Sequence, residues 1–390
     1  MNIYIHHKIT QKHRELNEQH FFCIFAEEIH TKTLNLVPLC ELNTLVVKKM
    51  NPKPTKILPA EWAEQQFVQL TWPHSETDWA DMLDEVNECF VNIAREIIKH
   101  QNLLIVCTDT DEVEELLGDA DLSKITFAEM PTNDTWARDH GGITVLEDGK
   151  PVVYDFTFNG WGMKFAANHD NMITRKLYAA GIFGNAGHRN CFDFVLEGGS
   201  IESDGEGSIL TTAECLLSDN RNNLSEEDIE AKLKEYFGLK QVLWLNHGYL
   251  AGDDTDSHVD TLARLCDRST IAYVKCDDPE DEHYEELRKM KKELRKFKTS
   301  DDKYFRLIAL PMADEVYFEG ERLPATYANF LIINGAVLVP TYNSPKDEIA
   351  KEQLKKAFPD REIVGINCNA LIKQHGSLHC VTMQYPSGKQ

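Results

Sequence analysis

The sequence predicts an α/β protein assembled from five similar units around a common axis. Strand-like and helix-like runs alternate along most of the 390 residues, but hairpins interrupt them, so a simple parallel, doubly wound sheet fits poorly. Polar clusters also recur 51 to 71 residues apart, each beside a strand-like run. Five units that each send one polar end to a common axis would produce this spacing, although no repeated sequence accompanies it.

The individual elements become regular from about residue 55. Asp78 is expected to cap a helix in which apolar side chains fall at helical spacing from Trp79 to Ile98, and a buried strand follows over 103–107. The turn at 147–150 predicts a hairpin of the strands that flank it, and Asn334-Gly335 predicts a second one.

Three helices and two strands complete the predicted pattern. Ser225 begins a helix that Gly238 ends, and a strand follows over 241–245. The run 283–298 predicts a highly charged, solvated helix. A helix over 346–358 and a strand over 362–366 bring the pattern close to the end of the chain.

Residues 1–54 differ from the rest of the chain. They carry scattered histidines without a sustained period and end in the run K-K-M-N-P-K-P. We expect this extension to be weakly ordered or not translated, with Met50 as the alternative start. Residues 55–390 are expected to form a single catalytic domain.

Composition limits the partners. A net charge of −23 argues against nucleic acid or an anionic membrane and is compatible with a cationic substrate. The ten cysteines form no C-x-x-C pair, and several lie in apolar runs, which is typical of reduced, buried thiols. The sequence shows neither an apolar stretch of membrane-spanning length nor a cleavable leader, so we expect a cytoplasmic protein.

The stretch T-D-S-H-V-D-T at 255–261 raises the question of its chemistry. In a strand, Asp256, His258 and Asp260 would share one face. Such a group suits a metal site or a general acid/base beside carboxylates that hold a cation. No second motif supplies further metal ligands, so a metal-dependent ureohydrolase stays the more distant alternative.

A cysteine-based reaction accounts for more of the polar clusters, which contribute Asp139, Glu197, His258, Asp260 and Cys380. Two carboxylates can hold a guanidinium in plane, and a thiolate can attack its carbon. An imidazole can then protonate the departing ammonia and activate water. Carboxylates raise the pKa of a nearby thiol, so a bound cation would help to form its own nucleophile. Each cluster alone has an ordinary structural explanation; the set predicts an enzyme.

Several longer motifs occur in order between residues 57 and 390: L-P-A-E-W (58–62), T-W-P-H (71–74), N-D-T-W-A-R-D (133–139), L-E-G-G-S-I-E (196–202), N-R-N (220–222), D-D-T-D-S-H-V-D-T-L-A-R (253–264), L-P-A-T-Y-A-N-F (323–330) and G-S-L-H-C-V-T-M-Q (376–384). This series resembles the agmatine deiminase and bacterial-type peptidylarginine deiminase family of guanidine-modifying enzymes. The resemblance implies the pentein fold, a five-bladed α/β propeller of pseudo-repeated ββαβ units with its active site on the axis.

The resemblance also implies roles for matching residues. Asp256 has none and is expected to order its loop. The implied roles are a nucleophile that forms an amidino-thioether (Cys380), a general acid/base (His258), a residue that orients it (Glu197), carboxylates that hold the guanidinium (Asp139, Asp260) and pocket-lining residues (Trp136, Asn329).

The implied reaction hydrolyses a guanidino group to a ureido group and ammonia, without metal or other cofactor. We expect agmatine to be converted to N-carbamoylputrescine in polyamine biosynthesis, with arginine or peptidylarginine deimination as the alternative. The partners expected are a small cationic guanidino substrate, neither nucleic acid nor membrane; a homo-oligomer stays open. Departures from the family pattern are expected to reshape the far end of the pocket: Gly142, Glu202, Ser257, Thr261 and 375–378.

Overall fold

The computed structural model describes residues 55–388. The predictions for the extension, including the alternative start at Met50, lie outside the described residues. Residues 55–388 form one compact unit, which contains every element discussed below.

Four units of this domain share one connectivity, an antiparallel pair of strands followed by a helix and a third strand parallel to the second. The first two are β5 (Ile143–Glu147), β6 (Lys150–Thr157), α7 (Ile173–Ala179), β7 (Gly187–Val195) and β8 (Ile201–Ser203), β9 (Ser208–Thr212), α9 (Glu226–Phe237), β10 (Gln241–Leu245). The next two are β11 (Ala263–Asp267), β12 (Thr270–Lys275), α10 (Tyr284–Leu294), β13 (Arg306–Pro311) and β16 (Leu331–Ile333), β17 (Ala336–Thr341), α11 (Lys346–Ala357), β18 (Glu362–Asn367).

Both ends of the described chain build the fifth unit. Strand β19 (Thr382–Pro386) pairs antiparallel with β2 (Gln65–Thr71), and α3 (Leu83–His100) leads to β3 (Asn102–Cys107), which is parallel to β2. Short β1 (Lys56–Ile57) extends the first sheet. Helix α4 (Thr110–Leu117) leads to β4 (Ile125–Glu129), which extends the last sheet.

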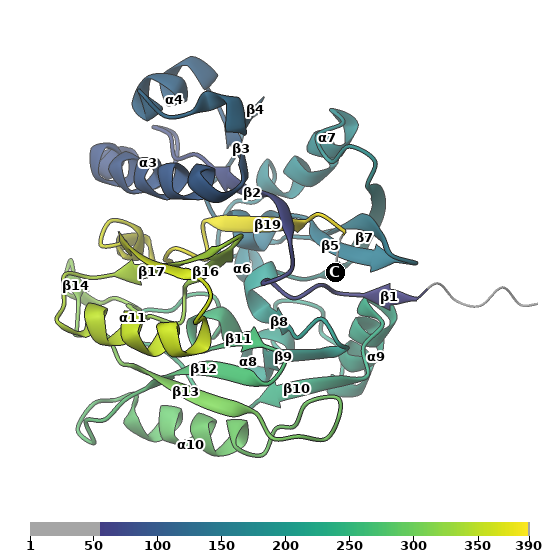
Figure 1. The fold of residues 1–390 in the computed structure, drawn as a ribbon, viewed down its shortest axis with the longest axis vertical. Helices are drawn as coiled ribbons and strands as arrows, with labels where there is room; N and C mark the ends of the chain where they lie inside the picture. Colours follow the sequence, from purple (N-terminus) through teal and green to yellow (C-terminus); the bar gives the residue numbers. More distant parts are fainter. Residues whose placement is uncertain (1–54, 389–390) are drawn as a thin grey trace, which may run out of the picture. The chain divides into compact units, whose positions relative to one another are not determined.

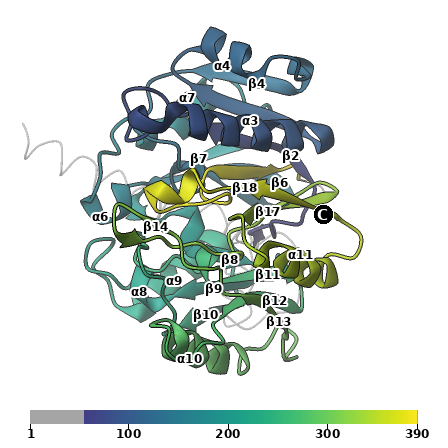
Figure 2. The same ribbon diagram turned by 90° about the vertical axis from the view of Figure 1, so that its left-hand side faces the viewer.

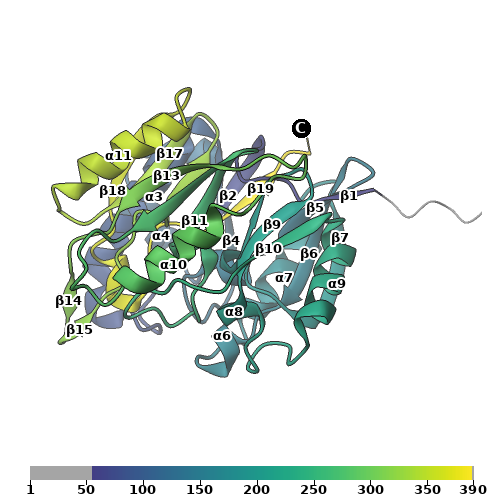
Figure 3. The same cartoon turned by 90° about the horizontal axis from the view of Figure 1, so that it is seen from below.

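Figures 1 to 3 show α3, α9, α10 and α11 on the outside of these sheets. Five ββαβ units with their helices outside are the five-bladed α/β propeller that the spacing and the resemblance predicted, and this prediction is confirmed.

The helices pack against the sheets through the apolar faces that their periodicity predicts. In α3 these include Phe90, Ile93 and Ile97, none of which is exposed. Two expectations need correction. Asp78 does not cap α3, because a 3-10 turn over Ala80–Met82 precedes the helix and no side chain caps it. The charged helix α10 is not merely solvated, since it buries an apolar stripe that includes Met290.

Other expected features agree with the structure. Ser225 accepts a hydrogen bond from the backbone N–H of Asp228 (3.2 Å), and Gly238 ends α9 in the left-handed conformation at φ 70°. Both predicted hairpins are present. The eight cysteines in the described part of the chain are unbridged and buried. Within residues 55–388 no helix combines the length and the apolar character needed to cross a membrane.

The first strand of each unit fixes where the polar clusters lie. Asp139, Glu197, Asp260, Asn329 and Cys380 all stand just before the first residue of β5, β8, β11, β16 and β19. The N-terminal ends of these five strands therefore present polar side chains at corresponding positions of the five units.

Candidate active site

The thiol of Cys380 lies in a polar, buried setting. Its Sγ is 3.2 Å from Nδ2 of Asn329, whose Oδ1 accepts hydrogen bonds from the backbone N–H groups of His379 (2.8 Å) and Cys380 (3.3 Å). Burial, followed by the charges of Asp260 and Asp139, raises the pKa of Cys380 well above its usual value. Cys380 is therefore a protonated thiol while no cation is bound.

Asp139 and Asp260 are both buried but differ in their partners. Asp139 accepts from the indole N–H of Trp161 (2.9 Å) and the backbone N–H of Gly199 (3.1 Å), and burial, with the charge of Asp260, raises its pKa strongly. Burial also acts to raise the pKa of Asp260, but the hydrogen bond from His379 Nδ1 (2.7 Å) and the charges of His379, His258 and Arg264 together outweigh it, so the pKa is lowered.

His258 and Glu197 stand next to these carboxylates. Nδ1 of His258 is 3.6 Å from Oδ1 of Asp139, and burial lowers the pKa of His258 to about 4. Glu197 has no exposed surface; its Oε1 accepts from Nε of Arg221 at 2.7 Å. Burial raises the pKa of Glu197 despite this ion pair. The imidazole is therefore neutral near pH 7, as a proton acceptor must be.

Gly199 is essential to this packing. A Cβ on Gly199 would lie 2.6 Å from Nδ1 of His258 and 2.8 Å from Oδ1 of Asp139. Likewise, a Cβ on Gly376 would lie 2.1 Å from the ring of Trp136. The stretch Glu197-Gly198-Gly199 therefore does more than form a turn. Because Gly199 has no side chain, its backbone can form one wall of the site.

A cavity of about 150 Å³ opens beside the thiol. Neither lysine nor arginine is among its lining residues, which are Asp78, Asp134, Trp136, Asp139, Trp161, Phe165, Asp254, Thr255, Gln374, His375, Gly376 and Cys380. Burial raises the pKa of both Asp134 and Asp254 to about 6. Asn329, predicted to line the pocket, is not among these lining residues, and its amide contacts the thiol of Cys380. The cavity suits a slender cation between aromatic side chains.

The stretch 255–261 is not a strand. His258 precedes a 3-10 turn over Val259–Thr261, and this turn, not strand alternation, brings His258 and Asp260 to the same site. Asp256 has a positive φ of 64° and pairs with Lys164 (2.7 Å) and Arg221 (2.6 Å). Its side chain orders the loop, as expected, and the strand-based reason for a metal site is wrong.

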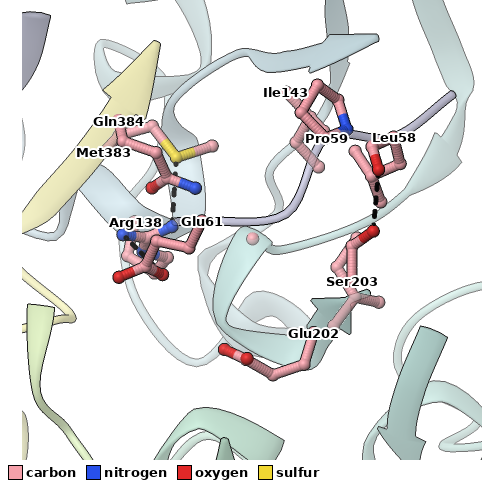
Figure 4. Close-up of a pocket in the computed structure, with 11 residues that line it drawn as sticks. Leu58, Pro59, Glu61, Arg138, Ile143, Glu202, Ser203, Met383 and Gln384 are labelled. Carbon is pink, nitrogen blue, oxygen red and sulfur yellow. Dashed lines mark hydrogen bonds and ion pairs between the residues drawn. The ribbon is translucent and has the colours of Figure 1, made fainter. Parts of the chain in front are cut away.

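A second cavity lies behind the site, and Figure 4 shows it with Glu61, Arg138 and Glu202 on its walls. Gly198 lines this cavity, whereas its neighbour Gly199 contacts the candidate catalytic side chains. Glu202 therefore does not reshape the far end of the thiol pocket. Of the departures from the family pattern, His375 and Gly376 line that pocket.

Arg264 is fully buried and contacts Glu61 and Glu202, which line the second cavity. Its guanidinium pairs with Glu202 and, at 2.7 Å, with Glu61, and it contacts Nε2 of His379 (3.0 Å). His379 in turn bridges Glu61 and Asp260 at 2.7 Å each. This network fixes the position of Asp260 through its hydrogen bond with His379.

Sequence reasoning assigned no role to Trp161, Arg221 or His379, although all three touch the candidate residues. The last two lie in the quoted motifs N-R-N and H-C. Trp161 had a weaker signal, the stretch N-G-W-G directly after β6, where Gly160 and Gly162 have positive φ. That turn brings the indole to Asp139.

Comparisons with known proteins agree with this geometry. The model of the Porphyromonas-type peptidyl-arginine deiminase family matches residues 57–386. The chain belongs to this family, as its motifs predicted, and its fold is that of the guanidine-modifying enzymes.

Three relatives illustrate the similarity. An agmatine deiminase of Pseudomonas aeruginosa is 30% identical, over 85% of this chain and 96% of its own length. A C. jejuni agmatine deiminase, solved with substrate as a cysteine-to-serine variant, is 41% identical over 86% of this chain and 97% of its own, with a TM-score of 0.81. A Porphyromonas gingivalis protein, described provisionally as an arginine deiminase, is 56% identical over 85% of this chain and 99% of its own, with a TM-score of 0.82.

Proposed function

We propose that this protein hydrolyses the guanidino group of agmatine to give N-carbamoylputrescine and ammonia, with Cys380 as nucleophile. The observation that carries the proposal is a cavity lined by the thiol of Cys380 and the carboxyl of Asp139 but by neither lysine nor arginine, with the neutral imidazole of His258 3.6 Å from Asp139. Family membership and the agmatine deiminases among the relatives support the same reaction.

In the first half-reaction, Asp139 and Asp260 hold the guanidinium through charge-assisted hydrogen bonds. The bound cation offsets the carboxylates that raise the pKa of Cys380, and the thiol passes its proton to His258. The Sγ–C bond forms, the C–N bond breaks, and the leaving nitrogen takes that proton and departs as ammonia. The enzyme then carries an amidino-thioether.

In the second half-reaction, His258 is again neutral and accepts a proton from water as that water attacks the amidino carbon. The C–S bond breaks, the thiol is restored, and the product leaves with a ureido group. Glu197, close to His258 and fixed by Arg221, orients and stabilises the imidazolium. Trp136 packs along the substrate, and Asn329 stabilises the thiolate through its amide N–H at 3.2 Å. The chain's own residues suffice for each of these steps.

The substrate's other end selects between agmatine and arginine. Asp78, Asp134 and Asp254 line the cavity away from the axis. These carboxylates favour the amine of agmatine and disfavour the α-carboxylate of arginine, which would need a cationic partner.

Arginine or peptidylarginine deimination is the second candidate, because of the family's description and the 56% identical Porphyromonas gingivalis protein. A metal-dependent ureohydrolase is disfavoured, because Asp256 pairs with Lys164 and Arg221 rather than turning to His258. We place the catalytic domain at 55–390 and its action in the cytoplasm, in polyamine biosynthesis.

The test is product analysis by mass spectrometry. The protein, a Cys380→Ala variant and a matched Cys266→Ala control are each incubated with agmatine, arginine and an arginine peptide, with a chelator present. Replacement of an imino nitrogen by oxygen in agmatine, absent only with Cys380→Ala, is the expected result.

Conversion of arginine or the peptide alone would keep the mechanism and reject the substrate. Activity that survives Cys380→Ala, or that the chelator abolishes, would reject the mechanism itself.

A further inference from the structure

The candidate catalytic histidine belongs to a second cluster, whose third member, Cys215, has no part in the deiminase mechanism. Ligand atoms of Glu197, Cys215 and His258 all lie within 4.8 Å of one another, and all three side chains are buried. Cys215 comes from the short helix α8 (Ala213–Leu216), directly behind the site, and has no exposed surface. A carboxylate, a thiol and an imidazole are the ligand types that Zn²⁺ prefers.

Two of these groups have unused hydrogen-bonding atoms. Oε2 of Glu197 and both ring nitrogens of His258 are buried, and none has a hydrogen-bond partner within residues 55–388. Buried polar atoms without partners are uncommon, because each costs free energy. Each of these two residues thus has an unpartnered polar atom, and one ligand atom of each lies within 4.8 Å of the thiol of Cys215.

We propose that Glu197, Cys215 and His258 form an inhibitory site for Zn²⁺ or a similar divalent transition-metal ion. Cys215 loses its thiol proton to solvent as the metal–sulfur bond forms, and neutral His258 donates a ring nitrogen. In a tetrahedral zinc site the ligand atoms stand about 3.3–3.8 Å apart, so the side chains close by roughly an ångström around the ion. Water completes the coordination.

The local charges favour a cation there despite the nearby guanidinium of Arg221. That guanidinium is shared by two carboxylates, Glu197 through Oε1 and Asp256, each at 2.6–2.7 Å. Asp139 adds a further carboxylate at 3.6 Å from His258. With Lys164 also paired to Asp256, the region holds three carboxylates (Glu197, Asp256 and Asp139) against two fixed cations, Arg221 and Lys164, and a divalent ion is attracted to it.

Metal binding here stops the reaction without blocking the pocket. His258 loses the lone pair that accepts the proton of the thiol, whereas Cys380 and the lining of the cavity stay free for substrate. The inhibited enzyme should therefore show a lower kcat with little change in KM. An ion held by Cys380 would instead compete with substrate and raise KM. This inhibition rests on the proposed function, but metal binding itself does not.

Direct binding is measured with Co²⁺, whose bond to a thiolate gives a near-ultraviolet charge-transfer band. All proteins carry Cys23→Ser and Cys40→Ser, because these two thiols lie outside the described residues. The band is expected in the Cys380→Ala variant and in a Cys266→Ala control, and it is expected to disappear in Cys215→Ala. Its persistence in Cys215→Ala, or its loss in Cys380→Ala, would overturn the proposal.

The functional arm titrates agmatine hydrolysis with Zn²⁺. Cys215→Ala should need at least about tenfold more Zn²⁺ for half-inhibition than the parent protein, consistent with the loss of one of three ligands. Cys215→Ser serves if the alanine variant fails to fold by circular dichroism. Equal Zn²⁺ sensitivity of parent and variant would reject the inhibitory role. If the protein has no deiminase activity, the Co²⁺ band alone decides the site.

Discussion

Two buried clusters in this protein combine carboxylates with an imidazole, and they differ in where their cation comes from. Glu61 and Glu202 hold the guanidinium of Arg264 beside His379. In the candidate active site, Asp139 and Cys380 line a cavity, and His258 and Asp260 lie close to Asp139. The same chemical groups thus form a structural ion-pair cluster in one place and a candidate cation-binding site in the other.

The electrostatics follow this difference. Burial acts to raise the pKa of Glu61, but Arg264 and His379 outweigh it and hold the pKa below its usual range. Within residues 55–388 no lysine or arginine pairs with Asp139, so burial and the charge of Asp260 raise its pKa. A buried cluster that contains its own cation is stable. In a cluster without one, the buried carboxylates are destabilising, and a bound cation relieves this cost.

The largest expected effect is on the complete cluster. Replacing Arg264 by Met leaves two buried carboxylates without their cation, and the free energy of unfolding should fall by about 3–5 kcal/mol. Urea denaturation measures it. Arg268→Met is the matched control, because Arg268 pairs with Glu206 while 75% exposed, and an exposed pair contributes less than about 1 kcal/mol. A loss below about 1 kcal/mol for Arg264→Met would remove the distinction between the two clusters.

A smaller effect, and on activity instead of stability, is expected for Asp139→Asn. Loss of one carboxylate from a buried charge pair costs about 2–5 kcal/mol of binding, so kcat/KM should fall by about 30- to 5,000-fold. The unfolding free energy should change by less than about 1.5 kcal/mol, because a costly buried charge is removed while the bond to Trp161 is weakened.

Steady-state kinetics and urea denaturation of the same preparation separate these two effects. The exposed Asp81→Asn serves as control and should change neither quantity. If Asp139→Asn destabilised the fold as much as Arg264→Met, Asp139 would have to be regarded as a structural residue.

The smallest effect concerns pH. His258 binds a proton near pH 6.5 when unfolded but only near pH 4 when folded, so acidification favours the unfolded chain. This pKa difference should cost about 2 kcal/mol of stability at pH 5 relative to pH 7. Urea denaturation at both pH values should therefore show a smaller acid loss for His258→Asn than for the parent protein. His169→Asn, at a partly buried position away from the thiol, should behave like the parent; equal losses for all three would contradict the lowered pKa.

Much of the fold followed from local sequence signals. The Asn334-Gly335 hairpin and the Ser225-to-Gly238 helix have turn and cap residues whose preferences act over a few positions, so their placement agrees with the structure. The helix behind Asp78 was placed too early, because the apolar spacing continues through a 3-10 turn that periodicity does not distinguish from a helix.

The candidate site was accessible for a different reason. Its residues precede the first strands of successive units, so spacing and motif together indicated that they meet. Trp161 and the Arg264 network escaped detection, because their contacts join residues 22 and 203 positions apart and no short pattern encodes them. The wall formed by Gly199 was likewise invisible, since only the assembled structure shows what a side chain there would strike.

The pairing of β19 with β2 has a consequence for how the protein is made. Thr382 lies opposite Leu70, so the fifth sheet joins segments from opposite ends of the described chain. A ribosome must release nearly the whole polypeptide before this sheet can form, and such distant pairing slows folding. Cys380 stands just before β19, so the nucleophile is fixed in place only when the propeller closes. A nascent or C-terminally truncated chain therefore has no assembled site, which prevents premature chemistry during synthesis.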